Sequence, residues 1–409
     1  MRTLHVTYSL DPRTGGPGHV IRHVIREQIR CGCEVALLST AIQARTSNRP
    51  QDEYEKSMFA DPDFQGAEIF MGKWYGHRRP WRALSFSPQC HRWLRRRLSD
   101  ERLAPDVVHI HSIFHYVTTM AAIEARRRCI PYIIEPYGCL DVFPLRQGYA
   151  WLKRLFMRWF MCRNLRYAAG IQPASDFEAD QVSHWVSRQS IHVIPHGVDV
   201  PVFDPVEAAR TFRAAFPQIV GRRVILCLGR IHAVKRPELI VEAMALLRRE
   251  CPDLILLVGG GNSGHLPALQ DAVRKHDLEA SVVYCGFIEG DLKPGAFAVA
   301  NLLAQPSAHE NFGVSCIEAM AHGVPALVTP EVGSCVHVEK SGGGIVVEGN
   351  ARAIAQGIRT LLHGDREALG RRGRRYVEQN LSWPVIVGQI NDLYRHVVDR
   401  NAKARGNGR

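Results

Sequence analysis

The sequence predicts an α/β protein built from two doubly wound, Rossmann-like domains, each with a parallel sheet flanked by helices. Short apolar runs alternate with longer amphipathic segments along the chain, which is the pattern of successive βα units. The chain has 409 residues, more than one compact core usually holds. Because 46% of the residues are hydrophobic and 22% are charged, each half has enough apolar content for a core of its own.

In the first half, the apolar runs predicted to be strands are 4–9, 35–39, 106–111 and 131–135. A glycine-rich turn that contains Gly16 follows the first run and precedes a helix that ends near Arg30. Such a turn lets the backbone approach a ligand closely, or it is simply tight. The segment 40–85 is polar and irregular, and it predicts no element. A helix is expected over 151–166, with aromatic residues on one face and basic residues opposite.

In the second half, the runs predicted to be strands are 224–228, 254–258 and 342–347, and the segment 301–305 leads the chain to Glu310. Helices are expected from Pro237, over 314–322, over 351–376 with a break near Gly364, and over 383–397. We therefore expect domains at 1–200 and 201–381, a separate C-terminal helix at 382–400 and a disordered polar tail at 401–409.

The stretch from Glu310 to Glu318 carries the most chemistry. Glu318 lies about one turn into the predicted helix, and the Asn311-Phe312-Gly313 turn presents backbone N–H groups at the helix N-terminus. Those groups suit an anion such as a diphosphate. A carboxylate beside a phosphate would repel it. Glu310 and Glu318 are therefore better placed to accept hydrogen bonds from hydroxyls, one from a sugar ring and one from a ribose diol. The stretch predicts a nucleotide-sugar site, or it is an ordinary amphipathic helix with a solvated glutamate at each end.

Two cations follow the first strand of the second half. Arg230 comes directly after that strand and its glycine, and Lys235 follows shortly afterwards. Such groups could neutralise the charge that develops on a departing diphosphate, unless they are unrelated surface residues. The run 259–264 satisfies G-x-G-x-x-G before a helix, but a histidine and a proline follow it, so it is a weak dinucleotide signal.

Charge and composition narrow the class of partner. The net charge of +12 implies an anionic partner, either a nucleotide, a nucleic acid or an acidic membrane surface. Recognised RNA-binding and zinc-finger signatures do not accompany the charge, so we expect no nucleic-acid partner. The lack of a long apolar run and of a cleavable leader predicts a cytoplasmic protein. The 11 cysteines include no C-x-x-C pair, which favours neither disulfides nor a zinc site.

Two groups of residues imitate metal ligands. Asp61-Pro62-Asp63 has the spacing of a D-x-D motif, but acids beside a proline are more typical of a surface turn. His109 and His111 alternate onto one face of a strand, with His115 nearby, and no fourth ligand is suggested. We expect no bound metal.

The order Glu310-x7-Glu318, followed by Gly323-Val324-Pro325, resembles the E-x7-E motif of retaining glycosyltransferases of family 4. This resemblance implies a GT-B architecture, in which two Rossmann-like domains face each other across a cleft and the last helix crosses back onto the first domain. It also implies a metal-independent hexosyltransferase that retains anomeric configuration and needs no cofactor besides its nucleotide-sugar donor.

The resemblance assigns roles to individual residues. Glu310 would face the donor sugar, while Arg230 and Lys235 would bind its diphosphate. The other donor-binding residues that it implies are Gly16, Phe287, Ile288, Asn311, Phe312, Gly313, Val314 and Glu318.

On the acceptor side, many family members have a histidine in the turn where this chain has Tyr137. A phenol with a pKa near 10 is a poor base at neutral pH, so we expect Tyr137 to position substrate rather than to move a proton. His111 would form the wall of the acceptor site, or it is a structural histidine. The acceptor implied by the resemblance is a glycan or a lipid-linked intermediate of cell-surface biosynthesis.

The predicted helix at 151–166 could rest on the anionic inner face of a membrane, through Lys153, Arg154 and Arg158, while its aromatic face packs on the sheet. The alternative is a packed helix with a solvated basic face.

Two other functions remain open at this stage: a GT-B nucleotide-sugar epimerase and a non-enzymatic basic protein that binds nucleic acid.

Overall fold

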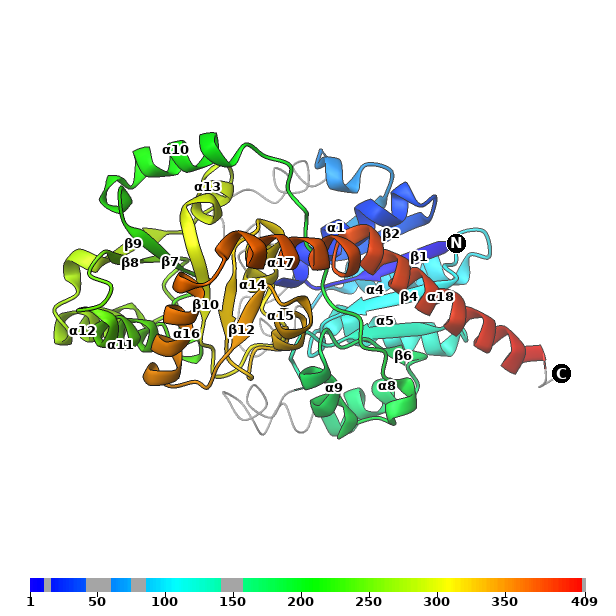
Figure 1. The fold of residues 1–409 in the computed structure, drawn as a ribbon. Helices are drawn as coiled ribbons and strands as arrows, with labels where there is room; N and C mark the ends of the chain where they lie inside the picture. The colour runs from blue at the N-terminus through cyan, green and yellow to red at the C-terminus, as the bar shows by residue number, and fades with distance from the viewer. Residues whose placement is uncertain (11–15, 42–59, 75–85, 141–156, 407–409) are drawn as a thin grey trace. The chain divides into compact units, whose positions relative to one another are not determined.

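A computed structural model describes residues 1–10, 16–41, 60–74, 86–140 and 157–406 (Figure 1). The chain forms two compact units, which are described separately below. The first comprises Met1–Gly197 together with Trp383–Arg409, and the second comprises Val198–Ser382.

The first unit contains a parallel sheet of six strands in the order β3-β2-β1-β4-β5-β6. Its strands are β1 Arg2–Val6, β2 Glu34–Thr40, β3 Glu68–Gly72, β4 Val107–His111, β5 Tyr132–Glu135 and β6 Gly170–Ile171. Its helices are α1 Gly16–Arg30, α4 Pro88–Ser99, α5 Tyr116–Arg127, α8 Cys162–Arg166, α9 Asp176–Ser183 and α18 Trp383–Gly406. Shorter turns of helix occupy Pro62–Phe64, Met157–Met161 and Arg188–Ser190.

Alternating side chains of β2 show that this sheet is covered on both faces. Ala36 and Leu38 pack in a core with residues of α4 and α5. Val35 and Leu37, which point the other way, pack in a separate core with residues of α1. A sheet with helices on both faces requires apolar residues at successive positions, which explains the unbroken apolar run of this strand.

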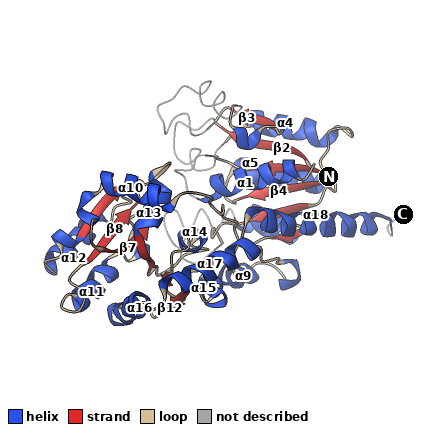
Figure 2. Ribbon diagram, turned by 45° about the horizontal axis from the view of Figure 1, so that its top comes forward, coloured by secondary structure: helices blue, strands red, loops and turns tan. Residues whose placement is uncertain are grey.

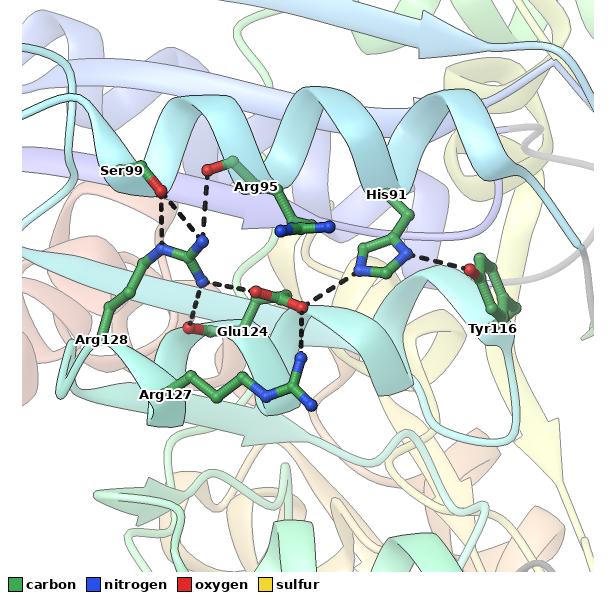
Figure 3. A network of polar contacts seen from close by, with 7 residues as sticks. All are labelled: His91, Arg95, Ser99, Tyr116, Glu124, Arg127 and Arg128. Carbon is green, nitrogen blue, oxygen red and sulfur yellow. Dashed lines mark hydrogen bonds and ion pairs between the residues drawn. The ribbon is translucent and has the colours of Figure 1, made fainter.

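A buried carboxylate fastens α4 to α5 (Figure 3). Glu124 on α5 is almost fully buried, and it accepts hydrogen bonds from His91 Nε2 at 3.1 Å and from Arg127 at 3.0 Å. Arg128 also donates to Glu124, and it reaches Ser99 Oγ on α4 at 2.9 Å. These ion pairs hold the pKa of Glu124 below its usual value despite the cost of burial. The carboxylate therefore serves to join two helices.

The second unit contains a parallel sheet of six strands in the order β12-β11-β10-β7-β8-β9. Its strands are β7 Arg223–Leu228, β8 Leu254–Gly259, β9 Val282–Gly286, β10 Ala300–Gln305, β11 Ala326–Val328 and β12 Gly344–Val346. Its helices are α10 Pro205–Ala215, α11 Glu238–Leu247, α12 Leu266–Lys275, α13 Leu292–Val299, α14 Val314–Ala321, α15 Cys335–Ser341, α16 Ala351–His363 and α17 Arg366–Asn380. Short 3-10 turns occupy Pro217–Ile219, Ala233–Lys235 and Glu279–Ser281.

Figure 2 shows each sheet in red with its helices in blue, and it confirms the predicted α/β, doubly wound fold class. In the second unit, β8 and β10 share a core with α11, α12 and α16. Residues such as Leu256 and Leu302 are fully buried there. Among the described residues, no helix combines the length and the apolar character needed to cross a bilayer.

Two predicted boundaries differ from the structure. The segment 40–85, which predicted no element, contains the edge strand β3, whose five residues lie between polar stretches and so give little periodic signal. The last helix does not end at 400 but continues to Gly406. Asn401 Nδ2 donates to Cys129 O at 3.0 Å and Arg405 donates to Arg128 O at 3.1 Å, so polar side chains of the predicted tail fasten it to the end of α5.

Candidate active site

The strand order of the second unit indicates where a binding site is expected, between β7 and β10. The order of strands reverses between these two neighbours, and ligands of doubly wound sheets bind outside the carboxyl ends of the strands at such a point. Arg230 and Lys235 follow β7, and Glu310 follows β10. The predicted residues therefore lie on both sides of the reversal.

Close backbone contact builds the turn after β7. A Cβ on Gly260 would lie 1.8 Å from the carbonyl oxygen of Gly229, so only glycine fits there, and both residues have positive φ. This contact explains the run 259–264 as a packing feature of the turns after β7 and β8. A small pocket lies beside them, and Gly229, Arg230, Lys235 and Gln305 are among the residues that line it.

Lys235 and Glu310 form an ion pair across the reversal point. Their side chains are 21% and 22% exposed, so each still reaches solvent. Gln305 Nε2 lies 3.5 Å from Glu310 Oε2, the same carboxylate oxygen that accepts from Lys235. Burial lowers the pKa of Lys235 to about 8. The structure thus brings together a cation and a carboxylate that the sequence separates by 75 residues.

The N-terminus of α14 adds backbone donors to this site. Gly313 precedes the helix with a φ of +89°, and a Cβ there would lie 2.6 Å from Val332 Cγ1. The first N–H groups of a helix, here from Val314 onward, have no partner within the helix, and they favour anions. Phe312 is 2% exposed, so its ring is not available to a ligand, whereas Asn311 is partly exposed.

Glu318 has a partner that the sequence did not indicate. Lys293 Nζ on α13 donates to Glu318 Oε1 at 2.7 Å. The pair depends on two helices that are adjacent in space, and an isolated lysine near a helix start gives no signal of it. Both glutamates of the stretch therefore have a lysine partner.

The segment after β9 shows one exposed and one buried apolar residue. Phe287 is 60% exposed, whereas Ile288 is buried against the end of β8, where a Cβ on Gly259 would lie 2.5 Å from its Cδ1. An exposed aromatic ring at the carboxyl edge of the sheet is available to a ligand. The side chain of Ile288 is buried and is not available to one.

The first unit has its own reversal point, between β1 and β4. Three residues just beyond β4 and β5 have positive φ although they are not glycine: Ser112 at 70°, Phe114 at 67° and Tyr137 at 53°. Such strained residues concentrate at ligand sites. Gly16 begins α1, but the residues just before it lie outside the described part of the chain, so its predicted role stays a prediction.

His111 does not form the wall of a site. Its side chain is 0% exposed, and its Nδ1 lies 3.1 Å from the hydroxyl of Tyr137. The alternation that places His109 and His111 on one face is correct, but that face is covered: His109 Nδ1 bonds the hydroxyl of Tyr394 on α18 at 2.6 Å. The predicted acceptor-side pair thus consists of one partly exposed residue, Tyr137, and one buried residue behind it.

The buried histidines are arranged for hydrogen bonding. His5 joins His109 and His111, and ligand atoms of the three lie within 4.8 Å of one another. His5 Nδ1 and His111 Nε2 are 2.9 Å apart, the length of a hydrogen bond. Two nitrogens about 2.0–2.1 Å from a tetrahedral zinc ion would be separated by about 3.3 Å. The geometry therefore favours a hydrogen-bonded pair.

The D-x-D imitation is engaged in ion pairs. Asp61 caps a short helical turn and pairs with Arg22, and Asp63 lies 3.4 Å from Arg26. These contacts fit the interpretation of a surface turn fastened to α1.

The predicted helix at 151–166 is described only from residue 157 onward. Met157 and Met161 are buried, whereas Trp159 is 67% exposed and Phe160 is 47% exposed. The expectation that the aromatic face packs on the sheet is therefore wrong for these two residues, because a π-helical turn over Met157–Met161 places the methionines inward instead. The basic residues Lys153 and Arg154 lie outside the described residues.

Comparison with known proteins identifies the family. Residues 15–197 match the family described as "Glycosyl transferase 4-like domain", and residues 209–376 match "Glycosyl transferases group 1". A D-inositol 3-phosphate glycosyltransferase of Kineococcus radiotolerans is 32% identical over 233 residues, which cover 52% of this chain and 53% of that protein. A mannosylfructose-phosphate synthase of Agrobacterium fabrum is 34% identical over 153 residues, covering 35% of this chain and 33% of that protein. The chain spans about half the length of the first of these curated relatives.

Solved structures show the same fold. A glycosyltransferase from Rickettsia africae has a TM-score of 0.73 at 16% identity and covers 97% of this chain and 98% of its own. Anabaena Alr3699/HepE in complex with UDP has a TM-score of 0.70 at 18% identity and covers 96% of this chain and 99% of its own. Both are consistent with two Rossmann-like domains of the GT-B fold. On the strength of the two matched families, which together account for most of its length, the chain belongs to glycosyltransferase family 4.

Proposed function

We propose that this protein is a retaining glycosyltransferase, which moves a hexosyl group from a nucleotide sugar to a hydroxyl of an acceptor. The observation that carries the proposal is the meeting of Arg230, Lys235, Glu310 and the N-terminus of α14 at the reversal point of the second sheet. This arrangement offers two cations and the backbone N–H groups at the start of α14 to a diphosphate, and a carboxylate to the hydroxyls of the sugar beside it.

The chemistry follows from these groups. As the bond between the sugar and the diphosphate breaks, negative charge grows on the departing phosphate oxygen, and Arg230 and Lys235 stabilise it. Lys235 must then exchange part of its contact with Glu310 for the phosphate. The acceptor hydroxyl attacks from the face that the diphosphate leaves, and the departing phosphate takes its proton, so that anomeric configuration is retained. These residues supply the charge neutralisation, so the proposed reaction needs no resident metal.

Relatives suggest where to look for substrates. Anabaena HepE was solved with UDP and with UDP-glucose, so uridine nucleotide sugars are the first donors to test. One relative is named a D-inositol 3-phosphate glycosyltransferase, and another is named a GDP-mannose-dependent mannosyltransferase of phosphatidylinositol monomannoside. We propose an acceptor of the same general kind, a glycan or a lipid-linked intermediate in cell-surface biosynthesis, used on the cytoplasmic side.

The first experiment is a thermal-shift screen of UDP- and GDP-sugars, in which the correct donor should raise the melting temperature of the protein. Incubation of that donor with candidate acceptors should then give a product whose anomeric proton, followed by NMR, keeps the configuration of the donor. Inverted product would contradict the retaining mechanism. Isomerised donor formed without acceptor would indicate an epimerase, and salt-sensitive retention of nucleic acid without affinity for any nucleotide sugar would indicate a binding protein.

Exposure of Trp159 and Phe160 supports a peripheral membrane contact of the first unit. Aromatic rings of this kind prefer the interface of a bilayer, and Arg163 and Arg166 lie exposed close by in the sequence. We propose weak, reversible binding to anionic lipid through this segment. In sedimentation with anionic vesicles, a variant with both Trp159→Ala and Phe160→Ala should lose most of the vesicle-bound fraction. Equal pelleting of variant and wild type would exclude this segment as the membrane contact.

A further inference from the structure

The hydroxyl of Tyr137 points into the protein. It donates to Glu135 Oε2 at 2.9 Å and lies 3.1 Å from His111 Nδ1. His111 Nδ1 is itself 3.1 Å from Glu135 Oε2, so the three groups form a triangle of short contacts. Glu135 and His111 are buried, at 2% and 0% exposure. The polar end of Tyr137 is therefore held by partners that no substrate reaches.

A chain of hydrogen bonds leads from this triangle into the first unit. His111 Nε2 bonds His5 Nδ1, and His5 Nε2 lies 2.8 Å from Gln28 Oε1. Gln28 Nε2 then donates to Asn391 Oδ1 on α18 at 3.0 Å. The phenol is thus anchored to β5, β4, β1, α1 and α18 in turn, which fixes its direction far more firmly than a single hydrogen bond would.

The ring of Tyr137 is fixed as well. It stacks on the ring of His196 with a centroid distance of 5.5 Å and an interplanar angle of 10°. The backbone has a φ of 53°, and the carboxylate of Glu178 accepts from the N–H groups of Gly138 and Ala174, which closes the turn. Tyr137 is nevertheless partly exposed. Its hydroxyl is engaged inside the unit, so the group that Tyr137 can offer to a ligand is its ring, one face of which stacks on His196.

We propose that Tyr137 serves the acceptor as an aromatic surface and that Glu135 is the positioning residue that keeps its hydroxyl turned inward. This inference rests on the proposed function, and it specifies the acceptor site: a sugar or another group that presents a C–H face packs on the ring. With its hydroxyl engaged by Glu135, this phenol offers a flat apolar surface. Specificity at this point comes from shape and apolar contact.

Four variants test the inference, with methyl glucopyranoside and methyl mannopyranoside as acceptor probes and the donor identified by the screen. Tyr137→Leu, which removes the aromatic surface, should raise the acceptor KM about tenfold while the affinity for nucleoside diphosphate stays unchanged. Tyr137→Phe keeps the ring but frees it from Glu135, so the KM should rise severalfold. Glu135→Leu should behave like Tyr137→Phe. Glu135→Gln can still accept from the phenol, so its acceptor KM should stay within about twofold of wild type.

A matched control separates positioning from folding. Glu124→Gln alters another buried carboxylate of the same unit, on α5, and it should lower the melting temperature without changing the acceptor KM. Loss of kcat in Glu135→Gln at unchanged KM would overturn the inference, because the carboxylate would then act in the reaction. A Tyr137→Leu variant with wild-type KM would overturn it equally.

Binding without turnover distinguishes this inference from the proposed function. Saturation-transfer NMR detects contact between the methyl glycosides and the UDP-loaded protein whether or not sugar is transferred. Signal in the wild type that is lost in Tyr137→Leu supports the aromatic surface even if no transfer occurs, in which case only the proposed function fails. No saturation transfer to either glycoside in the wild type would overturn the inference.

Discussion

The ion pair between Lys235 and Glu310 predicts that removing a carboxylate tightens diphosphate binding. In the free protein Lys235 is paired with Glu310, and it must leave that contact, wholly or in part, to meet a phosphate. Glu310→Gln removes the competing charge and keeps the shape of the side chain. We therefore expect the variant to bind nucleoside diphosphate more tightly than wild type while its rate of sugar transfer falls, because the carboxylate that we propose to face the sugar is lost.

The magnitude follows from the exposure of the pair. The two side chains are 21% and 22% exposed, and ion pairs that still reach solvent are worth about 1 kcal/mol or less. Removing that competition should lower the Kd for UDP by up to about fivefold. The gain should shrink for the intact donor, because the variant would also lose the hydrogen bond that we propose between Glu310 and the sugar.

Calorimetric titration with UDP and with the nucleotide sugar measures both effects. Glu331→Gln is the matched control: Glu331 lies in the same unit, 3.8 Å from Arg236, and the substitution changes net charge equally without touching Lys235. Weaker UDP binding by Glu310→Gln than by Glu331→Gln would refute the reasoning, since Glu310 would then support the diphosphate instead of competing for its lysine.

Three further predictions concern the second unit. Burial lowers the pKa of Lys235 to about 8, so the lysine loses its charge as the pH rises through that value. The affinity for UDP should therefore fall above pH 8 in the wild type but not in Lys235→Arg, because arginine stays protonated. Parallel pH profiles of the two proteins would contradict this prediction. Lys293→Met removes the lysine that is paired with Glu318, and it should raise the donor KM about twofold to fivefold with little change in kcat. An unchanged donor KM would show that Lys293 has no role in donor binding. Gly313→Ala would place a Cβ 2.6 Å from Val332 Cγ1, in a residue with positive φ. The free energy of unfolding, measured with urea, should therefore fall by about 1–3 kcal/mol. A variant as stable as the wild type would show that the turn can relax.

The fold was predictable because its signals are local. Apolar runs such as 224–228 and 254–258 recur between amphipathic segments, and they became β7 and β8 within a residue at each end. The edge strand β3 was missed because its short run, which opens with Glu68, lies between polar stretches. The continuation of α18 beyond residue 400 was missed because its support comes from carbonyls at the end of α5, far away in sequence.

The site was predictable only as far as its residues lie near one another in the sequence. The stretch from Glu310 to Glu318 gave its own helix and turn, whereas Lys293 and Glu135 became visible only when separate elements were brought together. His111 shows the opposite error. Its alternation along β4 was read correctly, but alternation says which face a side chain takes and not whether another element covers that face. Here Tyr394 on α18 covers the face at His109, and Tyr137 covers it at His111, the end of the strand.

The two lysine pairs also resolve a difficulty that the sequence raised, namely why carboxylates stand beside a diphosphate site. An unpaired carboxylate about 6 Å from a phosphate charge would cost about 3 kcal/mol at an effective dielectric constant of about 20. Pairing with a lysine cancels most of that repulsion, and the chain provides one lysine for each glutamate. The pairs should nevertheless differ in the bound state. Lys235 follows β7 beside Arg230, where the diphosphate is proposed to lie, so its contact is exchanged on binding; Lys293 lies on α13, where it can keep Glu318 neutralised throughout. Glu318→Gln should accordingly lack the tighter UDP binding expected of Glu310→Gln, and a gain in both variants would show that the carboxylates act only through the net charge of the site.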